Sequence, residues 1–266
     1  MRPHLSREPL ERLWRTASGA LASVFFPGDC RLCKQLLTNA SRIPLCETCL
    51  ASFAAIRPPI CQLCGQPDAA ASGAPEATTV CVACQEQTYR FHLARSFGIY
   101  EGALARAIVM LKFERIEPLG EWFARQLETI VLANEACLEA DVVVPVPLHR
   151  NRQKERGFNQ VELFARPLAR LLGLPFKPVL LMRTRPRPEK HLLPYEERWE
   201  AVRGAFAMKR EGRVDNSRVL LLDDVMTTGA TLDACAKALR DAGANSVLGL
   251  TVARAVRPVG PDVIRF

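Results

Sequence analysis

Apolar residues in the C-terminal two thirds of the chain fall into two alternating kinds of segment. Continuous apolar runs, typical of strands buried in a parallel sheet, occupy residues 141–148, 218–225 and 246–254. Shorter runs predict further strands at residues 97–100, 178–184 and 205–208. Helices are predicted between them at residues 104–113, 119–132, 159–172 and 231–239, with breaks or weak points at Pro118 and Pro167. Strands that alternate with helices predict βαβ units and an α/β fold with a parallel sheet.

The composition changes near residue 90, which suggests a domain boundary there. Residues 17–27 predict an amphipathic helix, whereas residues 65–79 and 183–197 predict long loops. No apolar run approaches the roughly 18 residues that a membrane helix needs, so we expect a cytoplasmic protein. We therefore expect a leader, a cysteine-rich domain and an α/β domain at residues 1–28, 29–90 and 91–266.

Eight of the ten cysteines form four C-x-x-C pairs: Cys30 with Cys33, Cys46 with Cys49, Cys61 with Cys64, and Cys81 with Cys84. Disulfides are disfavoured in a reducing cytosol, and two such pairs supply the four thiolates of a structural Zn²⁺ site. We predict two zinc ribbons with sequential pairing of the C-x-x-C motifs, although their spacing also permits a cross-braced pairing. Cys137 and Cys235 lie in helical patterns and are predicted to be buried apolar residues.

The stretch VLLLDDVMTTGAT, residues 219–231, places Asp223 and Asp224 directly after a buried strand. Ligands of open α/β sheets bind at this carboxyl edge of the strands. The loop that follows predicts a phosphate site, made of backbone N–H groups at a helix N-terminus and of threonine hydroxyls at Thr227, Thr228 and Thr231. Gly229 and Ala230 complete this loop, and Gly229 allows a close backbone approach. Because carboxylates accept hydrogen bonds from vicinal hydroxyls and can share Mg²⁺, the motif predicts a ribose 5-phosphate site.

A basic cluster follows another predicted strand, in the segment HRNRQKERGFNQ at residues 149–160. Four cations stand against the single acid Glu155: Arg150, Arg152, Lys154 and Arg156. Arginine suits phosphate because it is always charged and can grip two oxygens together. A basic excess also fits the net charge of +8 over 266 residues, which favours anionic partners such as phosphates or nucleic acid.

The motif DDVMTTGAT resembles the phosphoribosyl pyrophosphate signature of type I phosphoribosyltransferases. Together with the cysteine pairs, YEGALARAIVMLKFE at residues 100–114 and HRNRQKERGFNQ, it makes nearly the whole chain similar to the ComF (competence protein F) family. The resemblance implies a phosphoribosyltransferase-like parallel sheet with helices on both faces, preceded by a small double zinc ribbon. It implies that Asp223 and Asp224, the candidate catalytic pair, take the ribose hydroxyls and that Thr227 to Thr231 take the 5-phosphate. It assigns the pyrophosphate end to Arg150, Arg152, Lys154 and Arg156, together with Lys112.

The resemblance leaves two main hypotheses open, and both involve natural competence and imported single-stranded DNA. The first is a Mg²⁺-dependent phosphoribosyltransferase that displaces pyrophosphate at the ribose anomeric carbon. The second is a non-catalytic protein that uses the phosphoribosyl site for regulation and binds single-stranded DNA on its basic face, with Phe158, Tyr195 and Trp199 as candidate stacking residues. A third possibility also stays open, in which the zinc ribbons dock proteins of the competence machinery. The segment 183–206 departs from the family pattern, since Lys190 and Ala201 stand where a glutamine and an asparagine align.

Overall fold

The computed structural model describes residues 28–37, 42–67, 80–186, 195–209 and 212–256. The chain divides into two compact units, Met1–Phe53 and Ala54–Phe266. The predicted helix at residues 17–27, most of the predicted loop at 65–79 and the middle of the segment 183–197 lie outside the described residues. The domain boundaries near residues 28 and 90 remain predictions.

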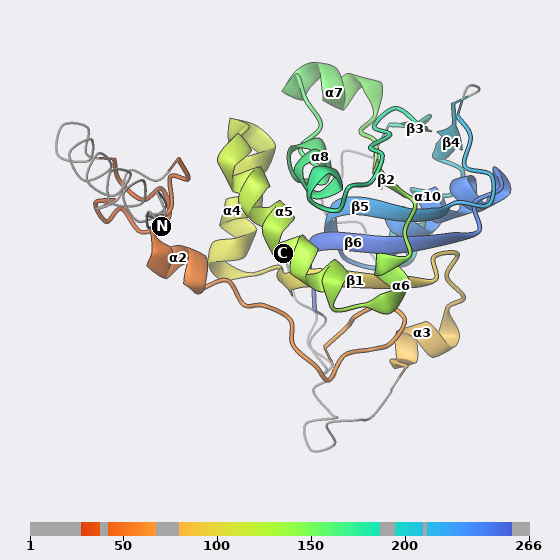
Figure 1. Cartoon of the computed structure of the whole chain (residues 1–266), viewed down its shortest axis with the longest axis horizontal. Helices are drawn as coiled ribbons and strands as arrows, with labels where there is room; N and C mark the ends of the chain where they lie inside the picture. Colours follow the sequence, from red (N-terminus) through yellow and green to blue (C-terminus); the bar gives the residue numbers. More distant parts are fainter. Residues whose placement is uncertain (1–27, 38–41, 68–79, 187–194, 210–211, 257–266) are drawn as a thin grey trace, which may run out of the picture. The chain divides into compact units, whose positions relative to one another are not determined.

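The larger unit is built on a sheet of four parallel strands in the order β1-β6-β5-β2 (Figure 1). The bounds of these strands are Leu93–Ile99 for β1, Val142–Pro145 for β2, Arg218–Met226 for β5 and Ser246–Arg254 for β6. The two central strands are the continuous apolar runs of the sequence, since parallel strands covered on both faces have no polar side. In β6 every residue from Val247 to Arg254 is buried. The predicted α/β fold is confirmed.

Helices cover both faces of this sheet. On one face α5 (Glu117–Leu132) and α8 (Glu162–Leu171) pack together and against the strands, and Phe123 and Phe164 are fully buried there. The other face is covered by α10 (Ala230–Asp241), whose Leu232 side chain lies against Gly249 of β6. The remaining helices of the larger unit are α3 (Val82–Glu86), α4 (Gly102–Glu114), α6 (Glu135–Leu138), α7 (Arg150–Arg156) and α9 (Tyr195–Glu200).

Two segments for which the sequence predicted no helix contain helices. The basic cluster forms α7, because His149 accepts a hydrogen bond from the Asn151 N–H at its start and Gly157, with φ 75°, ends it. Helix α9 begins within the predicted loop at residues 183–197 and extends beyond its end. Pro118 stands in the first turn of α5, where its missing N–H costs nothing, whereas Pro167 does lie inside α8.

A second, antiparallel sheet contains only β3 (Leu181–Arg183) and β4 (Phe206–Met208). It contacts α10 through β4. No helix in the described part of the chain is long and apolar enough to cross a membrane.

The first cysteine cluster belongs to the smaller unit. It consists of Cys30, Cys33, Cys46 and Cys49, whose sulfur atoms all lie within 4.8 Å of one another. The closest pairs are Cys33 with Cys46 at 3.6 Å and Cys30 with Cys49 at 3.7 Å. The short helix α2 (Glu47–Ala51) begins at Cys46, whose sulfur accepts a hydrogen bond from the Cys49 N–H.

The second cluster consists of Cys61, Cys64, Cys81 and Cys84 and belongs to the larger unit. Cys61, Cys64 and Cys84 are buried in the same hydrophobic core as the strands and α10. The turn at Cys64 and Gly65 docks on β1, because the Ala94 N–H donates to the Leu63 carbonyl at 2.7 Å. This cluster is therefore part of the α/β core.

Both clusters fit zinc. Four sulfurs about 2.3 Å from a tetrahedral ion lie about 3.8 Å apart, close to the 3.6–3.7 Å between sulfurs of neighbouring C-x-x-C pairs and far from a disulfide bond. The hydrogen bond from Cys64 is the largest cause that lowers the pKa of the Cys61 thiol, to about 4. A bound cation would favour the thiolate form in the same direction. The sequential grouping is the one found here.

Helices α5 and α8 approach each other closely at Gly120. A Cβ atom on Gly120 would lie 2.5 Å from the Leu163 carbonyl oxygen and 2.9 Å from the Leu163 Cβ. Backbone atoms of a packed helix cannot move aside cheaply, so only glycine fits.

We expect the purified protein to contain two zinc ions per chain by elemental mass spectrometry. Cys33→Ser and Cys64→Ser should each lose one ion, because each removes one of four thiolate ligands. Cys137→Ala is the matched control: its thiol is buried outside both clusters, so both ions should remain. A single zinc ion per chain in the unmodified protein would show that one of the two cysteine clusters does not bind zinc.

We expect Gly120→Ala to lower the free energy of unfolding by about 1–3 kcal/mol, as overpacking does in a filled core. Helix propensity alone predicts the opposite sign, a gain of about 1 kcal/mol. Chemical denaturation decides between the two signs, and a stabilised variant would contradict the close approach of α5 to α8.

Candidate functional site

A cavity of about 710 Å³ lies at the carboxyl edge of the sheet, where β2 and β5 end. Its walls come from the segment after β2, from α7, from the end of β5 with the start of α10, and from the β3–α9 region. The charged and polar side chains that line it are Lys112, His149, Asn151, Arg152, Glu155, Arg156, Gln160, Arg183, Arg198, Asp223, Asp224, Thr227 and Thr231. The structure thus brings the acidic motif and the basic cluster of the sequence to one cavity.

The two aspartates differ in their surroundings. Asp224 is 7% exposed, and its carboxylate lies 3.2 Å from the Lys112 ammonium and accepts a hydrogen bond of 2.6 Å from the Gln160 amide. Asp223 is half-buried, and its Oδ1 accepts a hydrogen bond of 2.9 Å from the Asp224 N–H. Asp224 is therefore held in place by its neighbours, while Asp223 is the more open acceptor of the pair.

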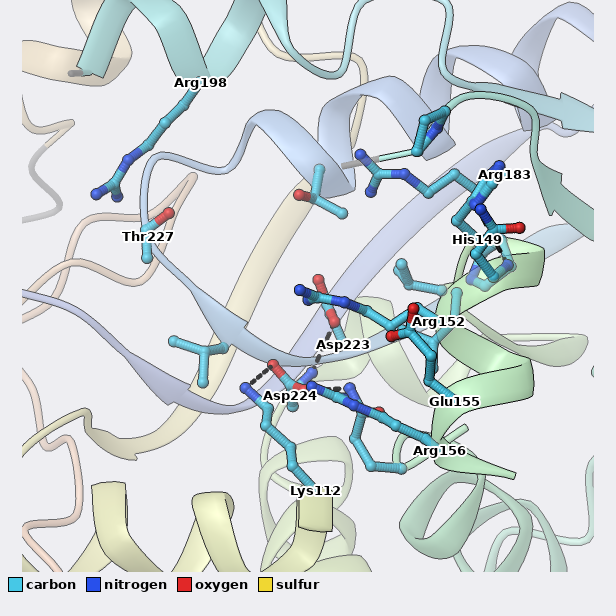
Figure 2. Close-up of a pocket in the computed structure, with 18 of the residues that line it drawn as sticks. Lys112, His149, Arg152, Glu155, Arg156, Arg183, Arg198, Asp223, Asp224 and Thr227 are labelled. Atoms are coloured by element: carbon cyan, nitrogen blue, oxygen red, sulfur yellow. Dashed lines mark hydrogen bonds and ion pairs between the residues drawn. The ribbon is translucent and has the colours of Figure 1, made fainter. Parts of the chain in front are cut away.

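Lys112, which the resemblance assigns to the pyrophosphate end of a ligand, lines the cavity and forms an ion pair with Asp224. It stands on α4 and rises from below toward the carboxylate in Figure 2. A buried carboxylate without a partner would be strongly destabilising, so the ion pair compensates the burial of Asp224. Gln160 extends the network, since its amide oxygen accepts a hydrogen bond of 2.9 Å from Arg156.

The basic cluster divides between two faces of α7. Arg152 and Arg156 line the cavity and extend toward the aspartates in Figure 2. Arg150 and Lys154 are exposed and are not among the lining residues, because residues two positions apart on a helix point to different sides. Of the four cations predicted to meet the pyrophosphate end, the structure brings only two to the cavity.

The loop that follows the aspartates has the geometry expected of an anion cradle. Gly229 has φ 84° and precedes α10, so its left-handed conformation turns the chain into the helix N-terminus. Thr227 and Thr231 line the cavity. Thr228 does not: it is buried, and its hydroxyl accepts a hydrogen bond from the Ala230 N–H at 3.2 Å, where it satisfies the first turn of α10.

One further carboxyl group lies in the first turn of α10. Burial raises the pKa of Asp233, and the Arg90 N–H, which donates to it at 2.5 Å, offsets part of this effect. Asp233 does not line the cavity. Its hydrogen bond ties the start of α10 to the segment that follows the second cysteine cluster.

Several cavity residues were not singled out as candidate site residues from the sequence. Among them, Arg183 lies over the Phe206 ring at 5.0 Å, and its Nε donates to the Arg185 carbonyl at 3.0 Å. Arg198 points into the cavity from α9, on the opposite side from α7 (Figure 2). Arg183 stands where the predicted strand at residues 178–184 meets the predicted loop at 183–197, and Arg198 directly follows that loop, so the high charge of this segment was the available signal.

The described part of the cavity wall carries five basic side chains against three carboxylates. This balance favours a polyanion over a neutral ligand, while the open carboxylate of Asp223 favours a donor such as a hydroxyl group. The arrangement can hold a phosphate at the α10 N-terminus and a second anionic group beside α7.

Comparisons with known proteins agree with both parts of this structure. The double zinc ribbon domain matches residues 21–85, and the phosphoribosyl transferase domain matches residues 162–262. The second match contains the aspartates, the loop at residues 227–231 and the segment with Arg183 and Arg198.

Three curated relatives match most of the chain. DNA utilization protein YhgH of Salmonella typhimurium is 31% identical over 224 residues, which cover 83% of this chain and 94% of the relative. Competence protein F of Haemophilus influenzae is 27% identical and covers 87% of this chain and 99% of the relative. Competence protein ComFC of Bacillus subtilis is 27% identical and covers 79% and 84%.

The similarity extends over the cysteine clusters and the α/β unit alike, and the fold matches what the sequence motifs predicted. The chain belongs to the ComF family, whose members join a double zinc ribbon to a phosphoribosyltransferase-like domain.

Proposed function

We propose that this protein binds phosphoribosyl pyrophosphate, or a similar ribose phosphate, together with Mg²⁺ in the cavity at the edge of the sheet. One observation carries the proposal: a single cavity combines an open carboxylate, a threonine-lined loop at a helix N-terminus and two arginines of α7. A sugar that bears phosphate at one end and diphosphate at the other needs these three kinds of contact.

In this proposal the ribose hydroxyls donate to Asp223, the member of the pair whose environment leaves it more open. Asp224 is paired with Lys112 and Gln160, and these contacts hold the end of β5 in place at the proposed ribose site. The 5-phosphate is held by the N–H groups at the start of α10 and by the hydroxyls of Thr227 and Thr231.

The diphosphate end is proposed to lie against Arg152 and Arg156. Guanidinium groups bind phosphate oxygens with two parallel hydrogen bonds and remain charged at all physiological pH values. Mg²⁺ would be held by the diphosphate and the oxygens of Asp223, where it would neutralise negative charge. Carboxylate oxygen is the donor type that Mg²⁺ prefers, so the residues present fit the ion.

A transferase reaction at this site would break the bond between the ribose anomeric carbon and the pyrophosphate oxygen. The electron pair of that bond would leave with the pyrophosphate, and the acceptor would supply the pair for the new bond. Arg152 and Arg156 would stabilise the charge that develops on the leaving group, and a fixed ribose would position the carbon. In this proposal the protein supplies binding and orientation, and the nucleophile belongs to the acceptor.

We further propose that this site acts in the handling of DNA during natural competence in the cytoplasm. The relatives are named competence protein F, competence protein ComFC and DNA utilization protein. These names support a role in DNA uptake or use.

We expect isothermal titration with phosphoribosyl pyrophosphate to give a binding heat that depends on Mg²⁺. Asp223→Asn keeps the shape of the side chain but removes the charged acceptor, so it should weaken binding about tenfold to a hundredfold. The absence of binding heat with and without Mg²⁺ would contradict the proposed ligand.

The two faces of α7 supply a matched control for the same titration. Arg152→Ala and Lys154→Ala each remove one positive charge from one helix, but only Arg152 lines the cavity. Arg152→Ala should therefore weaken binding about tenfold or more, while Lys154→Ala should change it by less than about threefold. Equal losses of affinity in the two variants would mean that only the overall positive charge of α7 matters, and would contradict a direct contact of Arg152 with the ligand.

A second candidate function, binding of single-stranded DNA, is favoured by two arginine–phenylalanine pairs beside the cavity. Arg156 lies over the Phe113 ring at 5.0 Å, and Arg115 lies over the Phe158 ring at 5.6 Å. Phe113 is 68% exposed, which is unusual for so large an apolar side chain. Aromatic faces next to cations are typical of proteins that stack single-stranded bases.

We expect Phe113→Ala to weaken the affinity for a short oligothymidine about fivefold or more, because one base would lose its stacking partner. Val109→Ala, on the same face of α4 and also exposed, is the control and should leave the affinity unchanged. Fluorescence anisotropy at two salt concentrations would separate stacking from phosphate contacts, since only the latter weaken steeply with salt.

A further inference from the structure

Arg254, the last residue of β6, reaches from the sheet to the second cysteine cluster. Its guanidinium donates to the Cys64 sulfur at 3.3 Å, to the Cys64 carbonyl at 2.8 Å and to the Gln66 side-chain oxygen at 2.7 Å. The residue is 5% exposed. Arg254 thus donates three hydrogen bonds to the turn that contains Cys64, one of the predicted zinc ligands.

A buried guanidinium needs a negative partner, and no carboxylate of the described residues forms an ion pair with Arg254. The cysteine cluster can supply that partner. Four thiolates around one Zn²⁺ carry two excess negative charges, and a cation beside a ligand sulfur offsets part of them. The charge of Arg254 therefore matches a metal-loaded cluster.

The same guanidinium also contacts the candidate ligand loop. Its Nη1 atom lies 2.9 Å from the sulfur of Met226, the residue paired with Arg254 in the β5–β6 register. Met226 is 2% exposed, and a Cβ atom on Gly229 would lie only 2.9 Å from its methyl carbon. Cys64, Arg254, Met226 and Gly229 thus form a continuous line of contacts from the cluster to the phosphate loop.

A second set of contacts leads from the cluster to the same loop. Shortly after Cys84, the Tyr89 hydroxyl donates to the Thr228 carbonyl at 3.2 Å, and its ring lies where a Cβ of Gly229 would be 3.0 Å away. The Tyr89 ring stacks on Phe91 at 4.5 Å, which fixes its orientation. The loop at residues 226–231 therefore rests on residues that the second cluster positions.

We propose that Arg254 is a positioning residue that couples the metal-loaded second cluster to the loop at residues 226–231, so that metal occupancy of this cluster sets the affinity of the loop for a phosphorylated ligand. Loss of the metal leaves the guanidinium without its anionic partner and frees Arg254, Met226 and Gly229 to rearrange. The statement about affinity rests on the proposed function, whereas the coupling itself does not.

Arg95 is a matched control for this proposal. Its guanidinium also lies in the larger unit beside the cluster, where it donates to the Gln62 carbonyl at 2.9 Å. It also donates hydrogen bonds to Ala94 and Asn134, neither of which belongs to the loop at residues 226–231. Arg95→Met therefore removes a neighbouring guanidinium without breaking the line of contacts through Met226.

The first measurement is zinc release to an excess of the chromophoric chelator 4-(2-pyridylazo)resorcinol, which should be biphasic with one phase for each cluster. Cys33→Ser should remove the phase of the first cluster and so assign the two phases. We expect Arg254→Met to speed release from the second cluster about tenfold or more and to leave the first cluster unchanged. Arg254→Lys keeps the positive charge and should recover most of the zinc retention.

The second measurement is amide hydrogen exchange of the peptide that contains residues 223–231, on the zinc-loaded protein without any ligand. Arg254→Met should raise exchange in this loop about tenfold, while Arg95→Met should leave it unchanged. In titrations with phosphoribosyl pyrophosphate and Mg²⁺, Arg254→Met should also weaken binding about tenfold. Saturating ligand should in turn slow zinc release from the second cluster only, because coupling between two sites is reciprocal.

Unchanged zinc release in Arg254→Met would overturn the proposal, and so would faster release without faster exchange in the loop. Equal loop exchange in Arg254→Met and Arg95→Met would show a general loss of stability and would also overturn it. If the unmodified protein binds no phosphoribosyl pyrophosphate, the proposed function fails, and the release and exchange measurements still decide whether Arg254 couples the cluster to the loop.

Discussion

The burial of the Asp224 carboxylate holds the three parts of the cavity together. A carboxylate that is 7% exposed needs compensation, and it receives it from Lys112 on α4 and from Gln160 just before α8. Gln160 in turn accepts a hydrogen bond from Arg156 on α7. The end of β5 and the helices α4 and α7 are thus oriented by one charged group.

This network gives the neighbouring acid a different role. Two adjacent carboxylates on one strand end would repel each other and any phosphate, but Lys112 cancels most of that effect at Asp224. Asp223 is the more exposed acid of the pair and lines the cavity, where Arg152 extends toward it (Figure 2). A cavity that combines five basic side chains with three carboxylates discriminates between a bare polyphosphate and one that also carries a hydroxylated sugar.

The strands and helices with a regular apolar pattern were predictable from the sequence. The face of a helix on which a side chain lies, and the features that depend on tertiary contacts, were not. Strand β6 coincides with its predicted range, because a strand buried on both faces has an unmistakable apolar run. The basic segment was recognised, but its helical conformation was not, so Arg150 and Lys154 could not be separated from Arg152 and Arg156. Thr228 does not line the cavity, and its hydroxyl satisfies a helix end, which residue type alone does not reveal. The sequence predicts strands at residues 178–184 and 205–208, but it predicts neither the pairing of β3 with β4 nor the helix α9, which bring Arg183 and Arg198 to the cavity.

The strand order also constrains the sequence of events during synthesis. Strand β1 lies beside β6, and the contact between Cys64 and Arg254 spans 190 residues, so the second cluster emerges from the ribosome long before its cationic neighbour. The first cluster has all four of its cysteines within the first 49 residues and can close around a metal early in translation. For most of its elongation the nascent chain therefore contains the second cysteine cluster without the strand β6 that later covers it. Until that strand is added, bound metal would have to protect these thiols from oxidation or mispairing.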